Sequence, residues 1–161
     1  MTDTRETVVS WLRDAHAMEA AAVDNIEKNI DRFEDFPTVQ QVFRDDLDAS
    51  RRNSKQLETT LERLDADSST LKDMGMKFAS SMQKLGAGAA SDDVVKHMLS
   101  AQAYKQFEVA SFRSLSTAAE TIGDSQLKAM CDRSVDEKKR LAARFEESLP
   151  QVTRDYLARV H

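Results

Sequence analysis

Apolar residues recur every three to four positions along most of this chain, and few residues interrupt the pattern. Such spacing places the apolar side chains on one face of an α-helix. The 161 residues include only 4 glycines and 2 prolines, the residue types that most often break helices. Aromatic residues make up 6%, which is few for the aromatic and β-branched clusters that strands favour. The pattern therefore predicts an all-α protein.

Four long helices can be placed from these stripes and from the residues that end them. The first ends before Pro37, because a residue that precedes proline avoids helical geometry. Thr38, Ser91 and Asp124 are the expected N-caps of the second, third and fourth helices. Gly123 is expected to make the tight turn before the fourth helix. The stripes comprise Val8, Leu12, Ala15, Ala22, Ile26, Ile30 and Phe33; Phe43, Leu47, Leu57, Leu61 and Leu64; Val94, Met98, Ala101, Phe112, Leu115 and Ile122; and Leu127, Met130, Leu141, Phe145 and Leu149.

Two shorter helices are also expected. One follows Pro150 at the C-terminus, and the other lies in the connection between the second and third long helices. Two helical hairpins joined by a connection of roughly 25 residues are typical of a four-helix bundle with one long crossover. Residues 1–161 are thus predicted to form a single helical-bundle domain. The stripe of the crossover helix comprises Leu71, Met74, Phe78, Met82 and Leu85.

Charge and cysteine content exclude several classes of protein. The net charge of −5 and the pI near 5.3 argue against a nucleic-acid-binding protein, which usually carries a basic stripe. The single cysteine, Cys131, cannot form an internal disulfide, and we expect it to be a buried, inert thiol in a reducing compartment. The polar N-terminus resembles no signal peptide, and no apolar run approaches the length of a membrane span. We therefore expect a cytoplasmic protein that binds neither nucleic acid nor membrane.

Two glutamates interrupt the apolar stripes. Glu19 lies four residues after Ala15 and three before Ala22, and Glu108 lies between Ala101 and Phe112 on the third long helix. A carboxylate in a protein core is costly unless it is paired, protonated or bound to a metal. The two glutamates therefore predict a polar layer inside the bundle.

Hairpin geometry indicates which residues face these glutamates. Reflection of Glu19 through the first turn leads near Arg52, so residues 49–53 lie at its level, and reflection of Glu108 through Gly123 leads to Lys138. Three interpretations remain open: an ionic layer without metal, a site for one or two metal ions, and a rotated bundle that partly exposes both glutamates. The cations that could balance the charge in an ionic layer are Arg51, Arg52, Lys105 and Lys138.

Three segments resemble a known family. Residues 11–19 have the sequence WLRDAHAME, residues 102–112 QAYKQFEVASF and residues 135–139 VDEKK. They are similar to the patterns L-x-D-x-Y-A-A-E, Q-x-x-E-H-Y-E-I-A-x-Y and L-x-E-E-K of the YciE/YciF branch of the ferritin-like superfamily. The resemblance covers nearly the whole chain and implies a ferritin-like four-helix bundle, a homodimer and an association with stress. It also implies a non-haem di-iron or di-manganese centre with Glu and His ligands.

Carried over by position, Glu19, Glu108 and Glu137 match carboxylate ligands of the family, and His16 lies one turn before Glu19. The second helix departs from the family's H-L-E-E-T-x-x-H/Q, because residues 46–53 have the sequence DLDASRRN and place Ala49 at the carboxylate position. A di-iron pair needs roughly four carboxylates and two histidines. At most three carboxylates remain, and the positions that have lost family ligands include Asn53, Lys105, Gln106 and Lys138. The resemblance therefore implies a degenerate metal site.

Two functions remain open. The preferred one is a non-enzymatic, stress-associated accessory protein that lacks a complete di-iron centre and acts through its surface or its oligomer, with no cofactor. The alternative is a non-haem di-iron or di-manganese protein that handles iron or peroxide. Its metal ligands would be Glu19, Glu108, Glu137 and His16.

Overall fold

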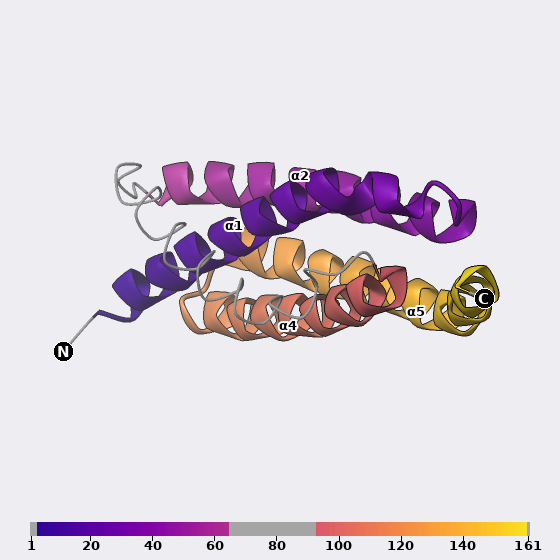
Figure 1. The fold of residues 1–161 in the computed structure, drawn as a ribbon. Coiled ribbons are helices and arrows are strands. Elements are labelled where there is room, and N and C mark those ends of the chain that lie inside the picture. Colours follow the sequence, from indigo (N-terminus) through magenta and orange to yellow (C-terminus); the bar gives the residue numbers. More distant parts are fainter. Residues whose placement is uncertain (1–2, 65–92, 161) are drawn as a thin grey trace.

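The computed structural model describes residues 3–64 and 93–160, and these residues form four long helices that pack as a bundle (Figure 1). The all-α four-helix expectation is confirmed for this part of the chain. The predicted crossover helix with Leu71 to Leu85 and the predicted cap Ser91 lie outside the described residues. The elements are α1 (Thr4–Asn29), the 3-10 helix η1 (Ile30–Phe33), α2 (Pro37–Arg63), α4 (Val94–Thr121) and α5 (Ser125–Arg159).

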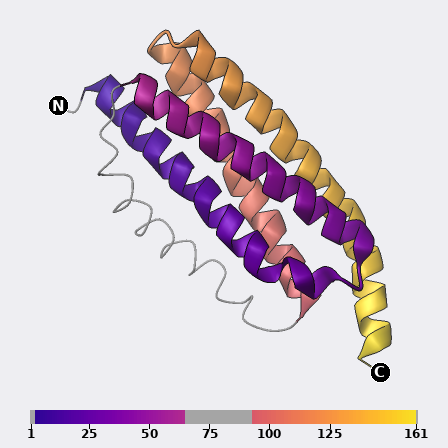
Figure 2. The same cartoon turned by 90° about the horizontal axis from the view of Figure 1, so that it is seen from above.

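The helices form two antiparallel hairpins that lie against each other. Helices α1 and α2 make one hairpin through η1, and α4 and α5 make the other through a turn at Gly123. Figure 1 shows the first hairpin as one layer and the second as the other, and Figure 2 shows how far the helices run side by side. Each hairpin therefore brings residues that are distant in sequence to the same level of the bundle.

Local sequence signals explain where most helices begin. The carboxylates of Asp3, Asp93 and Asp124 accept hydrogen bonds from backbone N–H groups in the first turns of α1, α4 and α5. The predicted cap Asp124 is thus confirmed. The predicted cap Thr38 is wrong, because α2 already begins at Pro37 and no side chain caps it. Proline suits this first position, since its ring fixes a helical φ and its missing N–H would have no partner there.

The predicted break at Pro150 is also wrong, because α5 continues through this proline to Arg159 without a separate C-terminal helix. Figure 2 shows α5 as one continuous helix that changes direction near its C-terminal end, as helices often do at an internal proline. Packing beyond the proline offsets the lost backbone hydrogen bond. Val152 is buried in the core, and the guanidinium of Arg159 lies 4.9 Å from the ring centre of Phe36 and pairs with Asp35 at 2.6 Å.

The buried apolar side chains form two clusters, one toward each end of the bundle. The first contains Leu12, Phe112 and Leu127, and the second contains Phe33 and Phe145. Along every helix a buried polar side chain lies where one cluster gives way to the other. The core is therefore divided by a polar layer near its middle. None of the described helices has the length and apolar character needed to cross a membrane.

The turn between α4 and α5 yields a prediction about Gly123, whose φ of +74° is in the left-handed region. A Cβ atom at this position would meet nothing within 4 Å, so only the backbone opposes a side chain. We expect Gly123→Ala to lower the free energy of unfolding by about 1–2 kcal/mol, measured by urea denaturation. Gly123→Asn should lose less, because asparagine tolerates this conformation. Equal stability of the Gly and Ala proteins would contradict the assignment.

Candidate functional site

The polar layer at the middle of the bundle contains five charged side chains, and all four long helices contribute to it. Glu19 comes from α1, Asp46 from α2, Lys105 and Glu108 from α4, and Lys138 from α5. None of these residues is more than 2% exposed. So many buried charges are unusual in a protein core and survive only with close partners.

Helical spacing and hairpin geometry explain how the sequence brings these side chains together. Asp46 follows the buried residues Val42 and Phe43 by four and three positions, so it lies on the core face of α2. Lys105 lies three residues before Glu108 and shares its face of α4. The reflection of Glu108 through Gly123 onto Lys138 is confirmed, because the two side chains meet at 3.3 Å.

Lys138 is the centre of the layer. Its Nζ atom lies 3.2 Å from Glu19 Oε2, 3.3 Å from Glu108 Oε1 and 3.5 Å from Asp46 Oδ1. It also donates a hydrogen bond of 2.9 Å to Ser50 Oγ. Burial alone would lower the pKa of Lys138, but the surrounding carboxylates of Glu108, Glu19 and Asp46 outweigh it and raise that pKa. The ammonium form is therefore the stable one in the folded protein.

Lys105 completes the ionic network on the other side of Asp46 and Glu108. Its Nζ atom lies 2.8 Å from Asp46 Oδ1 and donates a hydrogen bond to Glu108 Oε2. Each of these two carboxylates thus contacts both lysines. Burial tends to raise the pKa of Glu108, but the attraction of Lys105 and Lys138 holds it below its ordinary value. Glu108 is therefore ionised at neutral pH.

Glu19 differs from Glu108 because it holds a proton more tightly. With every group ionised, three carboxylates and two ammonium ions would leave one negative charge in the core. Burial, followed by the negative charge of Glu108, raises the pKa of Glu19 to about 8. Glu19 has an ion pair with Lys138, whereas Glu108 has ion pairs with both Lys138 and Lys105. A proton on Glu19, directed at Glu108, makes the network electrically neutral near pH 7.

Polar contacts also surround the charged network. Tyr104 donates a hydrogen bond from its hydroxyl to the backbone carbonyl of Met18, next to Glu19. Burial and the nearby negative charges of Glu108, Glu19 and Asp46 raise the pKa of Tyr104, so its phenol stays neutral. On the other side, Ser134 Oγ lies 3.2 Å from Asn53 Oδ1. These groups extend the polar layer from the charged network toward the apolar cluster that contains Met18 and Met130.

The structure places three of the predicted site residues outside the layer. Glu137, the third expected carboxylate, is partly exposed and pairs with Arg52 at 2.8 Å. Arg51 pairs with Glu27 at 2.5 Å on the surface of the first hairpin. The two arginines thus balance surface carboxylates, while Lys105 and Lys138 balance the buried ones.

His16, the histidine predicted to accompany Glu19, also lies outside the layer. It is half-buried, and burial lowers its pKa against the opposing attraction of Glu58. The neutral imidazole is therefore favoured. Of the predicted site residues, the structure brings together Glu19, Glu108, Lys105 and Lys138.

Asp46 is the site residue that sequence reasoning missed. The comparison with the family pattern directed attention to Ala49, where a carboxylate is expected, and Ala49 is a buried core residue. The carboxylate is supplied one turn earlier instead. A signal was present, because Asp46 continues the buried stripe of Val42 and Phe43 and precedes Ser50 by one turn. An acid within an apolar stripe therefore indicates a buried carboxylate on α2, as it does on α1.

The residues of the layer do not fit a di-metal centre. Ammonium groups cannot ligate a metal ion, and here two of them contact the carboxylates that a metal would need. Such a centre also takes imidazole ligands, and the histidines of the described part, His16 and His97, lie outside the charged network. Within residues 3–64 and 93–160, no three His, Cys, Asp or Glu side chains are arranged to hold a metal ion.

Cys131 has the properties expected of an inert thiol. Its side chain is buried among the apolar residues at one end of the bundle. Burial, followed by the negative charge of Asp132, raises the pKa of this thiol to about 12. The reactive thiolate is therefore scarce near neutral pH.

The fold and the charged layer define a class of protein: an all-α four-helix bundle with acids and lysines at its centre. Residues 3–158 match the family described as Domain of unknown function (DUF892), and the chain belongs to this family. It is also similar to the crystal structure of a protein (XCC3681) from Xanthomonas campestris pv. campestris, with a TM-score of 0.80 over 98% of each chain. The sequences of the two proteins are 22% identical, so this likeness supports the shared fold.

The proton on Glu19 yields a prediction about stability and pH. The pKa of about 8 in the folded state exceeds the ordinary value of 4.5, so the contribution of Glu19 to stability should be complete below pH 4.5 and be lost as pH rises toward 8. The slope is at most about 1.4 kcal/mol per pH unit. Glu19→Gln is neutral at every pH and should remove this contribution, measured by urea unfolding between pH 5 and 8.

The difference between variant and wild type isolates Glu19 from the other acids. Asp45 and Asp124 have lowered pKa values, so their contributions have the opposite sign and are lost only at lower pH. Glu137→Gln is the matched control, because it removes a carboxylate beside Lys138 that lies outside the network. Parallel stability curves for wild type and Glu19→Gln would show that Glu19 is ionised when folded.

Proposed function

We propose that this protein is a non-enzymatic, ferritin-like accessory protein of the stress-associated type, which acts through its surface or its oligomer. The observation that carries the proposal is the position of Lys138 Nζ, between 3.2 and 3.5 Å from three buried carboxylates. In bundles with di-metal sites, inward-facing carboxylates serve as metal ligands. Here the same kind of carboxylate binds a cation that belongs to the chain itself.

The chemistry of the layer supports a structural role for it. Lys138 is held in its charged form by the surrounding acids, and the acids are shielded from water at the middle of the core. The pKa of Glu19 is shifted, but none of these groups has the exposure that would let it exchange protons with a substrate. The alternative function, as a di-iron or di-manganese protein, would require Glu137 and His16 to leave their present positions and both lysines to withdraw.

The test is metal content after expression in medium supplied with iron or manganese. We expect substoichiometric metal in the purified wild-type protein, unchanged in Glu19→Ala and Glu108→Ala, together with no oxidation of added Fe²⁺ above the protein-free rate. Ferritin with an intact centre serves as the positive control. Two metal ions per chain that are lost in both variants would overturn the proposal and establish the alternative.

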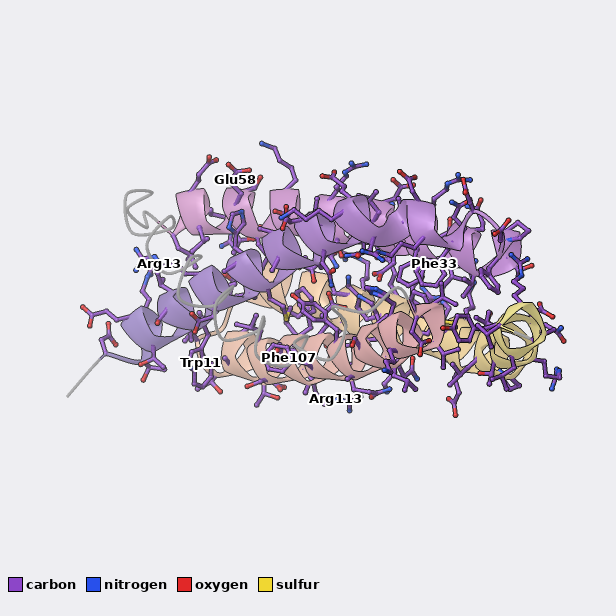
Figure 3. The ribbon with its side chains drawn as sticks, in the orientation of Figure 1. Trp11, Arg13, Phe33, Glu58, Phe107 and Arg113 are labelled. Carbon is purple, nitrogen blue, oxygen red and sulfur yellow. The ribbon has the colours of Figure 1, made fainter. Side chains whose placement is uncertain are left out.

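An apolar groove between α1 and α4 supports action through a surface. A cavity of about 380 Å³ lies between the Trp11–Met18 turns of α1 and the Phe107–Leu115 turns of α4. Trp11 is 45% exposed and Phe107 is 38% exposed, and Figure 3 shows both on the same side of the bundle. Exposed aromatic patches of this kind often mark protein interaction sites. We propose this groove as the contact with a second copy in the homodimer that the family resemblance implies.

The homodimer is tested by light scattering coupled to size-exclusion chromatography. Wild type is expected to elute with the mass of two chains. Trp11→Glu should shift the equilibrium toward the monomer, because it places a charge in the apolar contact. Leu157→Glu is the control, since Leu157 is 51% exposed on the last turns of α5. A monomeric wild type, or a dimer that Trp11→Glu leaves intact, would exclude this interface.

A further inference from the structure

We infer that the four oxygen atoms around the Lys138 Nζ atom form a binding site for an ammonium group. A free ammonium or small alkylammonium ion can occupy this site when the lysine side chain is shortened. The oxygens belong to Glu19, Asp46, Ser50 and Glu108, on three different helices, and Lys138 reaches them from the fourth. This inference rests on the proposed function, according to which the acids of the layer bind an ammonium group of the chain itself.

The distances select the class of cation. The four oxygens lie between 2.9 and 3.5 Å from the nitrogen. Hydrogen bonds from a charged nitrogen to oxygen have lengths of about 2.7–3.2 Å, which matches the inner part of this range. Calcium requires oxygens at about 2.3–2.6 Å, and magnesium at about 2.0–2.1 Å. A divalent ion would need this shell to contract by roughly 1 Å.

The rest of the network keeps the four oxygen atoms at their present spacing when the ammonium group of Lys138 is removed. Lys105 contacts both Asp46 and Glu108, so it continues to hold these carboxylates in place. The residues that supply the oxygens are nearly fully buried on packed helices. A core of this density does not close freely around a lost side chain. Shortening Lys138 is therefore expected to leave a cavity lined by oxygen atoms.

Charge balance points to a monovalent ion. The native network is neutral when Glu19 is protonated, so loss of Lys138 leaves one unpaired negative charge in the core. One ammonium ion restores neutrality and supplies N–H donors to the same oxygens. A divalent ion would restore neutrality only by displacing the proton of Glu19. Metal binding would then release a proton, whereas ammonium binding would not.

The experiment measures the melting temperature of Lys138→Ala in different chloride salts at equal ionic strength. In sodium chloride the variant should melt well below wild type. Ammonium or ethylammonium chloride should recover a large part of this loss in a saturable manner, because these ions can donate N–H hydrogen bonds inside the cavity. Tetramethylammonium chloride, which has no N–H group, should give no recovery. Wild type should show no difference among the salts.

Two further measurements make the result decisive. In Lys138→Ala/Asp46→Asn the excess negative charge is removed, so the dependence on ammonium should disappear. If Lys138→Ala does not fold in sodium chloride, its refolding yield in ammonium against tetramethylammonium chloride provides the same comparison. Equal effects of the two salts, or stronger stabilisation of Lys138→Ala by Mn²⁺ than by ammonium, would overturn the inference. These outcomes concern the Lys138→Ala variant and test the ammonium site. The proposed function is tested separately, because it would be overturned by two metal ions bound to the wild-type protein.

Discussion

The contact of the Lys138 ammonium group with Glu19, Asp46 and Glu108 is the interaction on which the rest of the structure depends. It joins all four long helices at one level, and every partner is nearly fully buried. Removal of one partner from a buried ion pair typically costs about 3–5 kcal/mol, because the other charge is then stranded. Axial sliding of any helix would separate these charges, so the layer specifies the register of the bundle more sharply than the apolar clusters on either side of it.

Much of this layer could be predicted from the sequence, because helical spacing and the position of the turns determine which residues face one another. Glu19 and Glu108 are acids within apolar stripes, and the tight turn at Gly123 fixes which residue faces Glu108. For the hairpin of α1 and α2, reflection leads to the correct level of α2, because Ser50 contacts Lys138. It does not give the face of the helix, and Arg52 lies at the surface of that level, where it pairs with Glu137.

The remaining differences come from effects that sequence patterns do not express. Asp46 supplies a carboxylate one turn away from the family position. Its place in the buried stripe of α2 indicates that it faces the core, but only the packing of α2 against the other helices shows that it contacts both lysines. Pro150 is normally a signal to end a helix. Here the burial of Val152 and the contact of Arg159 with Phe36 favour continuation, because tertiary packing outweighs the local preference.

A buried ionic layer is not the most stable solution for a helix bundle, since well-packed apolar residues often serve as well or better. In this chain the inward-facing acids Glu19, Asp46 and Glu108 require cations, and two lysines supply them. A metal ion would meet that need with an exchangeable ligand and redox chemistry, whereas Lys105 and Lys138 meet it permanently. A tethered cation meets the need of these acids without leaving the folded chain, so the layer belongs to the packing of the bundle itself.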